Sequence, residues 1–279
     1  MILIADCGAT KADWCLIDGK KAVGSLKTTG YNAATTPPSA LASIIERELL
    51  PHLPRQPRVS ALYFYGAGCI EPFAEGVRLT LRQFFPEAET DVQADLMAAA
   101  RALCGTRPGI VCILGTGSAT GFYDGERIVD QVPSLGYILG DEGSGAALGR
   151  RLIADVFKGQ LPPDIAGKFL EQYGLRLPEV IENVYRKPAA NRYLASFAPF
   201  LLDNIEHPDV RRLVADSFND FFCRNIRHYE RYGTRAVNIV GSIGWHFRHE
   251  LARSAAATGF TLGTVLKAPL PALIDRLLF

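Results

Sequence analysis

One short pattern occurs twice in the chain, and it limits the folds that the chain can adopt. Residues 2–5 (ILIA) form an apolar run that leads into DCGATKADW and an Asp-Gly turn at 18–19. Residues 110–114 (IVCIL) do the same, leading into GTGSATGFY and an Asp-Gly turn at 124–125. Each copy has the residues of a strand, a polar glycine turn, a second strand, a hairpin and a third strand.

Superposing Gly8 on Gly117 aligns the preceding apolar runs and the small polar residues that follow. A duplication of this kind predicts two similar halves with a cleft between them. The alternative is chance similarity between two short hairpins. We expect the boundary near the Arg107-Pro108 step, which gives domains of 1–107 and 108–279, with the last helix able to pack back on the N-terminal domain.

Strand and helix patterns alternate around the two copies, which predicts the α/β class. Further strands are expected near 22–28, 61–65, 90–94 and 235–241. Helices are expected near 39–50, 72–85, 95–105, 144–159, 207–233 and 244–258, with 207–233 as one long amphipathic helix stopped by Gly233.

Composition excludes several classes of protein. The 279 residues carry 30 Lys and Arg against 29 Asp and Glu, a net charge of +1, which excludes a non-specific nucleic-acid binder. With 48% hydrophobic residues the chain is not mostly disordered. Without a membrane-spanning run or export signal we expect a cytoplasmic protein with no membrane partner, as a possible homodimer. The cysteines then read as reduced core residues: Cys7, Cys15, Cys69, Cys104, Cys112 and Cys223.

Both glycine turns follow directly after a strand, where backbone N–H groups can converge without a Cβ in the way. The first turn adds the carboxylate of Asp6 and the hydroxyl of Thr10. The second adds Thr116, Ser118 and Thr120. Two such turns facing each other would hold a polyphosphate, and Asp6 would hold its Mg²⁺ through water. The alternative is a pair of ordinary hairpin turns.

Other nucleotide and hydrolase signatures are missing from the sequence. No G-x-x-x-x-G-K-[ST] occurs, which excludes a P-loop protein. The third glycine of GTGSATG is in the wrong place for a dinucleotide fingerprint, and no G-x-S-x-G occurs.

Four further polar positions have both a structural and a chemical interpretation. Asp95 opens a predicted helix, either as its N-cap or as a base that takes a proton from an attacking hydroxyl. Asp141 and Glu142 lie between glycines before a helix, either as a capped start or as acceptors for substrate hydroxyls. Asn32 is a turn former or a ligand contact. The VGSIG turn at 240–244 could support a flat ring on bare backbone.

These motifs carry a family resemblance when they are taken in order. The set DCGAT, GYNAAT, QAD-LMAAARALCG, ILGTGSATGFYDG, LGYILGDEGSGAALG and IVGSIG resembles the BadF/BadG/BcrA/BcrD-type ATPase family, and within it the N-acetylglucosamine kinase branch. That family belongs to the actin-like, sugar kinase and Hsp70 ATPase superfamily. The likeness runs from residue 2 to the C-terminal APLPALIDRLLF.

The resemblance implies two ribonuclease-H-like domains, each with a mixed five-stranded sheet flanked by helices, and ATP with Mg²⁺ in the cleft. It implies ATP contacts at Gly8, Ala9, Thr10, Lys11, Gly115, Thr116, Gly117, Gly241 and Ser242, with Mg²⁺ held through water by Asp6. Asp95 matches the general base, and the implied sugar contacts are Asn32, Asp95, Ser118, Gly136 and Asp141.

The chain departs from the branch at two positions. Ala119 follows GTGS where the sugar kinases usually have Asn, which removes one hydrogen bond worth about 1 kcal/mol. The sugar-side loop, SLGY at 134–137, is less rich in glycine and tryptophan than usual.

The resulting expectation is an enzyme, a kinase that uses ATP to phosphorylate an amino sugar such as N-acetylglucosamine or a related hexosamine. Two alternatives share the fold. One is an ATPase that activates a radical dehydratase through a cluster held by cysteines. The other is a non-catalytic protein that senses a nucleotide or a sugar.

Overall fold

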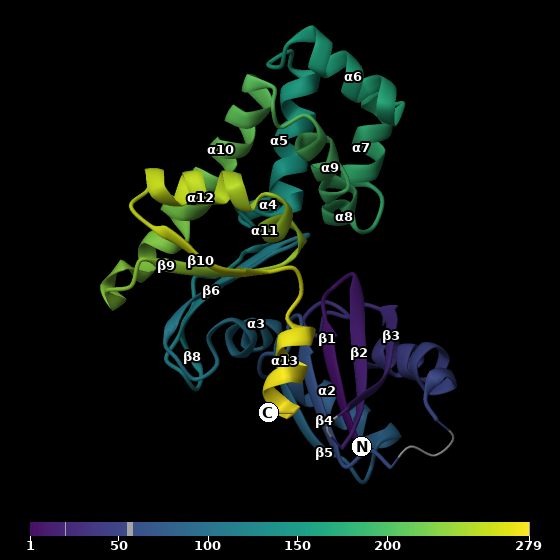
Figure 1. The fold of residues 1–279 in the computed structure, drawn as a ribbon. Helices are drawn as coiled ribbons and strands as arrows, with labels where there is room; N and C mark the ends of the chain where they lie inside the picture. The colour runs from purple at the N-terminus through teal and green to yellow at the C-terminus, as the bar shows by residue number, and fades with distance from the viewer. Residues whose placement is uncertain (20, 55–57, 279) are drawn as a thin grey trace. The chain divides into compact units, whose positions relative to one another are not determined.

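The computed structural model describes residues 1–19, 21–54 and 58–278. The chain divides into two compact units. The first unit contains Met1–Gly105 and the C-terminal segment that begins at Pro269, and the second contains Thr106–Ala268. Figure 1 shows the elements of each unit.

The first unit is built on a mixed five-stranded sheet in the order β3-β2-β1-β4-β5. Its strands are β1 (Ile2–Cys7), β2 (Lys11–Asp18), β3 (Lys21–Thr29), β4 (Ala61–Gly66) and β5 (Glu89–Ala94). The strand β1 lies at the centre and is apolar throughout except for Asp6, as expected of a strand that is covered on both faces.

Helices cover this sheet and enclose its core. They are α1 (Pro38–Ile44), the π-helical turn η1 (Ile45–Leu49), the 3₁₀ turn η2 (Leu50–His52), α2 (Phe73–Phe84), α3 (Asp95–Cys104) and α13 (Leu270–Leu278). Trp14 and Phe64 meet in the core with ring centroids 5.8 Å apart. The indole N–H of Trp14 donates to the hydroxyl of Thr28 over 2.9 Å, so this buried ring keeps its polar group satisfied.

The second unit has its own mixed sheet, in the order β10-β9-β6-β7-β8. Its strands are β6 (Gly109–Leu114), β7 (Ser118–Tyr123), β8 (Ile128–Asp130), β9 (Ala236–Val240) and β10 (Thr261–Leu266). In both units the first strand pairs antiparallel with the second and parallel with the fourth, and the outer pairs match as well. The predicted duplication, with two mixed five-stranded sheets flanked by helices, is confirmed.

The second unit is richer in helix. Its helices are α4 (Gly136–Leu139), α5 (Gly145–Phe157), α6 (Pro163–Tyr173), α7 (Leu177–Tyr185), α8 (Ala190–Ala195), α9 (Ala198–Asp203), α10 (Pro208–Arg224), the 3₁₀ helix η3 (Ile226–Tyr232), α11 (Ser242–His246) and α12 (Arg248–Ala257). Aromatic rings fill the space between α6, α8 and α9, where Phe169 contacts Phe197 and Phe200 edge to face. Figure 1 shows α5 to α9 gathered beyond one end of this sheet.

Strand pairing corrects the alignment of the two copies. Residues 8–10 separate β1 from β2, and residues 115–117 separate β6 from β7. Gly8 therefore corresponds to Gly115, and the predicted superposition of Gly8 on Gly117 is wrong by two residues. The letters after each glycine look alike, but the ends of the paired strands fix the register.

Two predicted helices are interrupted. The helix expected over 207–233 ends as an α-helix at Arg224 and continues as η3, because the Asn225 side chain turns to donate to Glu142 over 3.3 Å. The helix expected over 244–258 is divided at Phe247, whose ring is buried in the core. Such tertiary contacts leave no trace in hydrophobic periodicity.

The cysteine prediction needs one correction. Five of the six cysteines are buried, but Cys223 on α10 is exposed, and none of the six is in a disulfide. Among the described residues, no helix has the length and apolar character needed to cross a membrane.

Gly149 provides a test of the packing in the second unit. A Cβ there would lie 1.8 Å from the Leu194 carbonyl oxygen, so α5 and α8 can approach this closely only through glycine. We expect Gly149→Ala to lower the free energy of unfolding by about 1–3 kcal/mol. Gly167→Ala, at an exposed position of α6 with open space around it, should instead be neutral or stabilising by up to about 1 kcal/mol. Urea unfolding measures both, and equal effects would contradict the packing argument.

Candidate functional site

The first glycine turn is held in place by a second glycine. The N–H of Gly30 donates to the Thr10 carbonyl over 3.1 Å, and the N–H of Tyr31 donates to the Gly8 carbonyl over 3.1 Å. A Cβ on Gly30 would lie 2.3 Å from the Gly8 carbonyl oxygen, so only glycine allows this contact. Sequence reasoning missed Gly30, although its position directly after β3 in GYNAAT was a signal.

The predicted phosphate contacts of this turn lie at the surface. Ala9, Thr10 and Lys11 are exposed, and Gly8 is partly exposed. The backbone N–H groups of Gly8 and Thr10 donate to no acceptor among residues 1–19, 21–54 and 58–278. Two unused donors on a turn of this kind are available to an anion.

Lys11 and Asp6 both have Asp13 as a neighbour. Lys11 Nζ lies 3.0 Å from Asp13 Oδ2, and Lys27 Nζ lies 3.9 Å from Asp13 Oδ1. Asp13 is the cross-strand partner of Asp6 in the β1–β2 pair. The predicted ATP contact Lys11 is therefore engaged by a carboxylate in the protein as it stands.

The negative charge of the Asp6 carboxylate is poorly stabilised by its surroundings. Burial, followed by the negative charges of Asp95 and Asp13, raises its pKa to about 7. No hydrogen bond to its side chain occurs among the residues that the structure describes. Nor do those residues contain a group of three or more His, Cys, Asp or Glu side chains placed to hold a metal. A Mg²⁺ ion at Asp6 would thus keep most of its water, which suits both this ion and the predicted contact through water.

Asp95 is the first residue of α3 rather than the residue before it. Ala94 is the N-cap, so the interpretation of Asp95 as the cap is wrong. The Asp95 carboxylate instead accepts the N–H of Leu96 over 2.9 Å. Burial raises the pKa of Asp95 to about 6, against the smaller opposite effect of the backbone N–H groups of Leu96 and Asp95 itself. A partly buried carboxylate with this pKa is suited to accept a proton near neutral pH.

Asn32 acts as a turn former. Its Oδ1 accepts the N–H of Ala34 over 3.0 Å, and its carbonyl accepts the N–H groups of Thr35 and Thr36. Its side-chain NH₂ donates to no acceptor within the described part of the chain, so the ligand-contact interpretation stays open for that group. Asn32 and Asp95 belong to the first unit, and the other predicted sugar contacts belong to the second.

The second glycine turn is attached to the start of α5. The N–H of Gly145 donates to the Gly115 carbonyl over 2.8 Å, and the N–H of Ala146 donates to the Thr116 carbonyl over 3.1 Å. Within the turn, the Gly115 N–H donates to the Gly117 carbonyl over 3.0 Å. The predicted nest is thereby reduced, because the amides of Thr116 and Gly117 are the two in this turn that keep no acceptor among the described residues.

Asp141 fixes the far end of this turn. Its Oδ1 accepts the N–H of Ser118 over 3.2 Å, and its own N–H donates to the Ser134 carbonyl over 3.0 Å. Asp141 has a φ of +55°, which is uncommon outside glycine and indicates a residue held by its surroundings. Burial raises its pKa, and the bond from Ser118 partly offsets the rise. The cap of α5 is Ser144, which accepts the N–H of Ala147, so Asp141 is not the capping residue.

The remaining predicted positions lie in turns of the second unit. Gly241, at φ +125°, approaches β6 so closely that a Cβ would lie 2.2 Å from the Leu114 carbonyl oxygen, and Ser242 after it is exposed. Gly136, at φ +71°, has open space around its Cα. The segment around Gly136 exposes three large apolar side chains, those of Leu135, Ile138 and Leu139.

Asp6 offers a test that needs no substrate. A pKa raised in the folded state means that the folded state binds the proton more tightly, so stability falls as pH rises from about 4 to about 7. We expect Asp6→Asn to stabilise the protein by about 1–3 kcal/mol above pH 7, with the gain disappearing near pH 4. Thermal unfolding across this range measures it, with Asp18→Asn, at the exposed end of β2, as the control. An equal gain at both ends of the range would contradict the burial argument.

Comparisons with known proteins place this geometry in a family. No family model and no curated protein matches the chain. A solved structure of a "putative N-acetylglucosamine kinase" from Porphyromonas gingivalis is 42% identical, with a TM-score of 0.95, over 100% of this chain and 99% of that one.

Two more distant solved structures show the same fold. A second "putative N-acetylglucosamine kinase", from Chromobacterium violaceum, is 20% identical with a TM-score of 0.75, over 99% of this chain and 98% of that one. A ROK family glucokinase from Streptomyces griseus, solved with glucose and AMPPNP, is 13% identical with a TM-score of 0.55, over 99% and 97%. At 42% identity to the first of these relatives over its whole length, the chain belongs to the N-acetylglucosamine kinase-like branch of the BadF/BadG/BcrA/BcrD-type ATPase family, with the actin-like ATPase fold.

Proposed function

We propose that the protein is an ATP-dependent kinase that phosphorylates a hydroxyl group of an amino sugar, N-acetylglucosamine or a related hexosamine. The observation that carries the proposal is the partly buried Asp95 carboxylate at the start of α3, with its pKa raised to about 6, in a chain 42% identical to a "putative N-acetylglucosamine kinase". Phosphoryl transfer to a sugar needs a base at the acceptor hydroxyl and donors for the phosphate oxygens.

The first unit would supply the base. In its ionised form Asp95 would accept the proton of the attacking hydroxyl as the new O–P bond forms. The Leu96 N–H would keep the carboxylate oriented in both protonation states, because it donates to one oxygen and leaves the other for the substrate. The side-chain NH₂ of Asn32, which has no acceptor in the described part of the chain, would donate to a sugar hydroxyl.

Backbone donors would hold the phosphates. Among the residues that the structure describes, the amides with no acceptor are those of Gly8 and Thr10 in one turn and of Thr116 and Gly117 in the other. Such amides bind oxyanions without any contribution from Lys or Arg, which agrees with a net charge of only +1. Gly241 and Ser242 would contact the adenosine, and Asp141 would meet a sugar hydroxyl with the oxygen that Ser118 does not use.

Asp6 would hold the magnesium ion through water. Its oxygen donors are the kind that Mg²⁺ prefers, and burial with the negative charges of Asp95 and Asp13 raises its pKa more than the charge of Lys11 lowers it. When bound, Mg²⁺ neutralises charge on the phosphate oxygens.

Asp95→Asn tests the base. The amide keeps the size of the side chain but cannot accept the proton, so we expect sugar-dependent ADP release to fall at least a hundredfold. ATP should still bind, as measured by calorimetry, because the proposed phosphate donors are untouched. Near-normal turnover by Asp95→Asn would remove Asp95 from the role of base.

The pH profile provides a second test of the same group. Because the pKa of Asp95 is raised to about 6, the ionised form needed for proton transfer is lost as pH falls through 6. We expect kcat/KM to decline about tenfold per pH unit below that point. A profile that stays flat from pH 8 to pH 5 would contradict the assignment.

A panel of sugars distinguishes the proposed kinase from its alternatives. ADP release that depends on an amino sugar supports the kinase, whereas binding without release supports a sensor. The activator of a radical dehydratase needs surface cysteines to hold a cluster; Cys104 and Cys112 are buried, as are three others, and Cys223 on α10 is the single exposed one of the six.

A further inference from the structure

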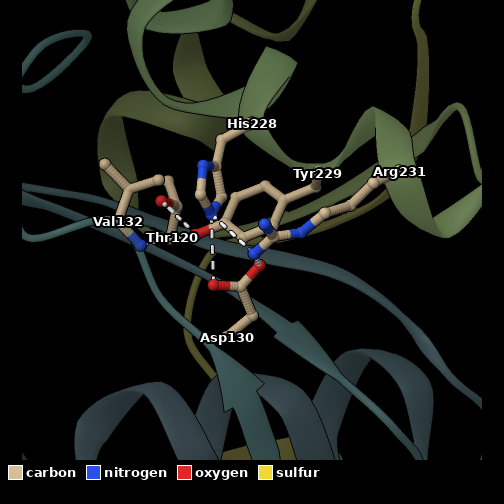
Figure 2. A network of polar contacts seen from close by, with 6 residues as sticks. All are labelled: Thr120, Asp130, Val132, His228, Tyr229 and Arg231. Carbon is tan, nitrogen blue, oxygen red and sulfur yellow. Dashed lines mark hydrogen bonds and ion pairs between the residues drawn. The ribbon is translucent and has the colours of Figure 1, made fainter.

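A buried tyrosine joins two separate segments of the second unit. Tyr229, on η3, is fully buried, and its hydroxyl accepts the N–H of Val132 over 2.9 Å. The same hydroxyl lies 3.0 Å from the Thr120 hydroxyl on β7, and the two share a hydrogen bond (Figure 2). Burial raises the pKa of this phenol to about 12, so it stays neutral and can donate as well as accept.

Both segments lead to the second glycine turn. Thr120 and Ser118 lie two residues apart on β7 and so share one face of that strand. Val132 is joined through Pro133 to Ser134, whose carbonyl accepts the N–H of Asp141.

The bond from Ser118 to Asp141 completes a closed circuit of hydrogen bonds and short chain segments. Starting from the turn, its members are Ser118, Asp141, Ser134, Val132, Tyr229 and Thr120.

The tyrosine itself is fixed from both sides. His228 Nε2 lies 3.1 Å from Asp130 Oδ1, and Arg231 donates to the other oxygen of Asp130 at the end of β8 (Figure 2). Burial alone would raise the pKa of Asp130, but the bonds from Arg231 and His228 outweigh it and lower that pKa. The carboxylate therefore stays ionised and clamps η3 to the sheet on either side of Tyr229.

We propose that Tyr229 is a positioning residue that sets the geometry of the 115–118 turn through Thr120 on one side and through Val132 and Asp141 on the other. The inference deepens the proposed function, because that turn carries two of the proposed phosphate donors. Tyr229 itself would touch neither ATP nor the sugar. Its hydroxyl would limit the movement of Ser118 and Asp141 relative to each other.

Tyr229→Phe tests the proposal, because it removes the hydroxyl and keeps the ring. The readout is amide hydrogen exchange of the whole protein by NMR, which requires no catalytic activity. We expect the Val132 amide to exchange at least about tenfold faster, since its acceptor is lost, and those of Ser118 and Asp141 to follow by about threefold or more. Amides in the centre of β6 serve as the reference for global unfolding.

Tyr123→Phe is the matched control. Tyr123 is also buried on β7, but its hydroxyl donates to the Gly125 carbonyl over 2.8 Å, at the opposite end of the strand. It should leave exchange at Ser118 and Asp141 unchanged even where it lowers the melting temperature. Unchanged exchange at both of these amides in Tyr229→Phe as well would overturn the proposal.

Thr120→Val separates the two sides of the circuit. It removes the bond to β7 but leaves the bond from Val132 to Tyr229, so the Val132 amide should stay protected while that of Ser118 exchanges faster. Faster exchange at Val132 and unchanged exchange at Ser118 would show that the tyrosine acts only on its nearest neighbour, and would overturn the proposal.

Kinetics adds a readout that a loss of stability alone would not change. In an active enzyme, Tyr229→Phe should raise the KM for ATP about three- to tenfold with a smaller effect on kcat, and Tyr123→Phe should change neither. If the unaltered protein releases no ADP with any sugar, the proposed function fails, while the exchange measurements still decide the role of Tyr229.

Discussion

The second glycine turn is held at one end by the bond from the Ser118 amide to the Asp141 carboxylate. A glycine-rich turn has few side chains to hold it, so its own backbone groups must be satisfied by the rest of the protein. Here the carbonyls of the turn accept the first amides of α5, and one end of the turn donates to Asp141. Two neighbouring amides of the turn, those of Thr116 and Gly117, have no acceptor among the described residues, while its other backbone groups are bonded. Free amides of this kind can bind an anion without a lysine.

The first unit solves the same problem with glycine instead of a carboxylate. Gly30 lies against the Gly8 carbonyl, closer than a Cβ would permit, and the N–H groups of Gly30 and Tyr31 donate to the carbonyls of Thr10 and Gly8 in that turn. The carboxylates nearby remain poorly compensated, as the raised pKa values of Asp6 and Asp95 indicate. Charge concentrated in this way costs stability at neutral pH, which is a common cost of sites that handle protons and cations.

Sequence alone could predict the fold class and most elements of the sheets. The repeat consists of apolar strands and glycine turns, and these local patterns can be recognised in the sequence without knowledge of tertiary contacts. The register of the repeat was wrong by two residues, because the strand ends at Cys7 and Leu114 are set by pairing with neighbours. The break in the long helix at Asn225 depends on Glu142, far away in the chain, so periodicity could not reveal it.

For the candidate site, too, the sequence indicates part of the answer and the tertiary contacts supply the rest. The glycine and helix signals beside Asp95 and Asp141 were enough to select these residues as candidates. The contacts that surround their side chains could not be predicted from the sequence. That Asp95 begins α3 rather than capping it is a shift of one residue that helix signals do not resolve, and the bond from Ser118 to Asp141 joins segments 23 residues apart. Gly30 was missed although it begins the GYNAAT motif, and Tyr229 was missed because it belongs to no motif; each matters through what lies against it.

Both units have the same strand order, and the predicted phosphate contacts and three of the predicted sugar contacts lie on different connections between strands. The turns that would hold phosphate join the first strand to the second in both units, and they are equally short. The predicted sugar contacts Asn32, Gly136 and Asp141 lie instead on the connection from the third strand to the fourth, which holds α1, η1 and η2 in one unit and the longer series α4 to α10 and η3 in the other. Lengthening that connection leaves the sheet pairing untouched, so under the proposed function the segments that would contact the acceptor can change while the turns that would bind the donor stay the same.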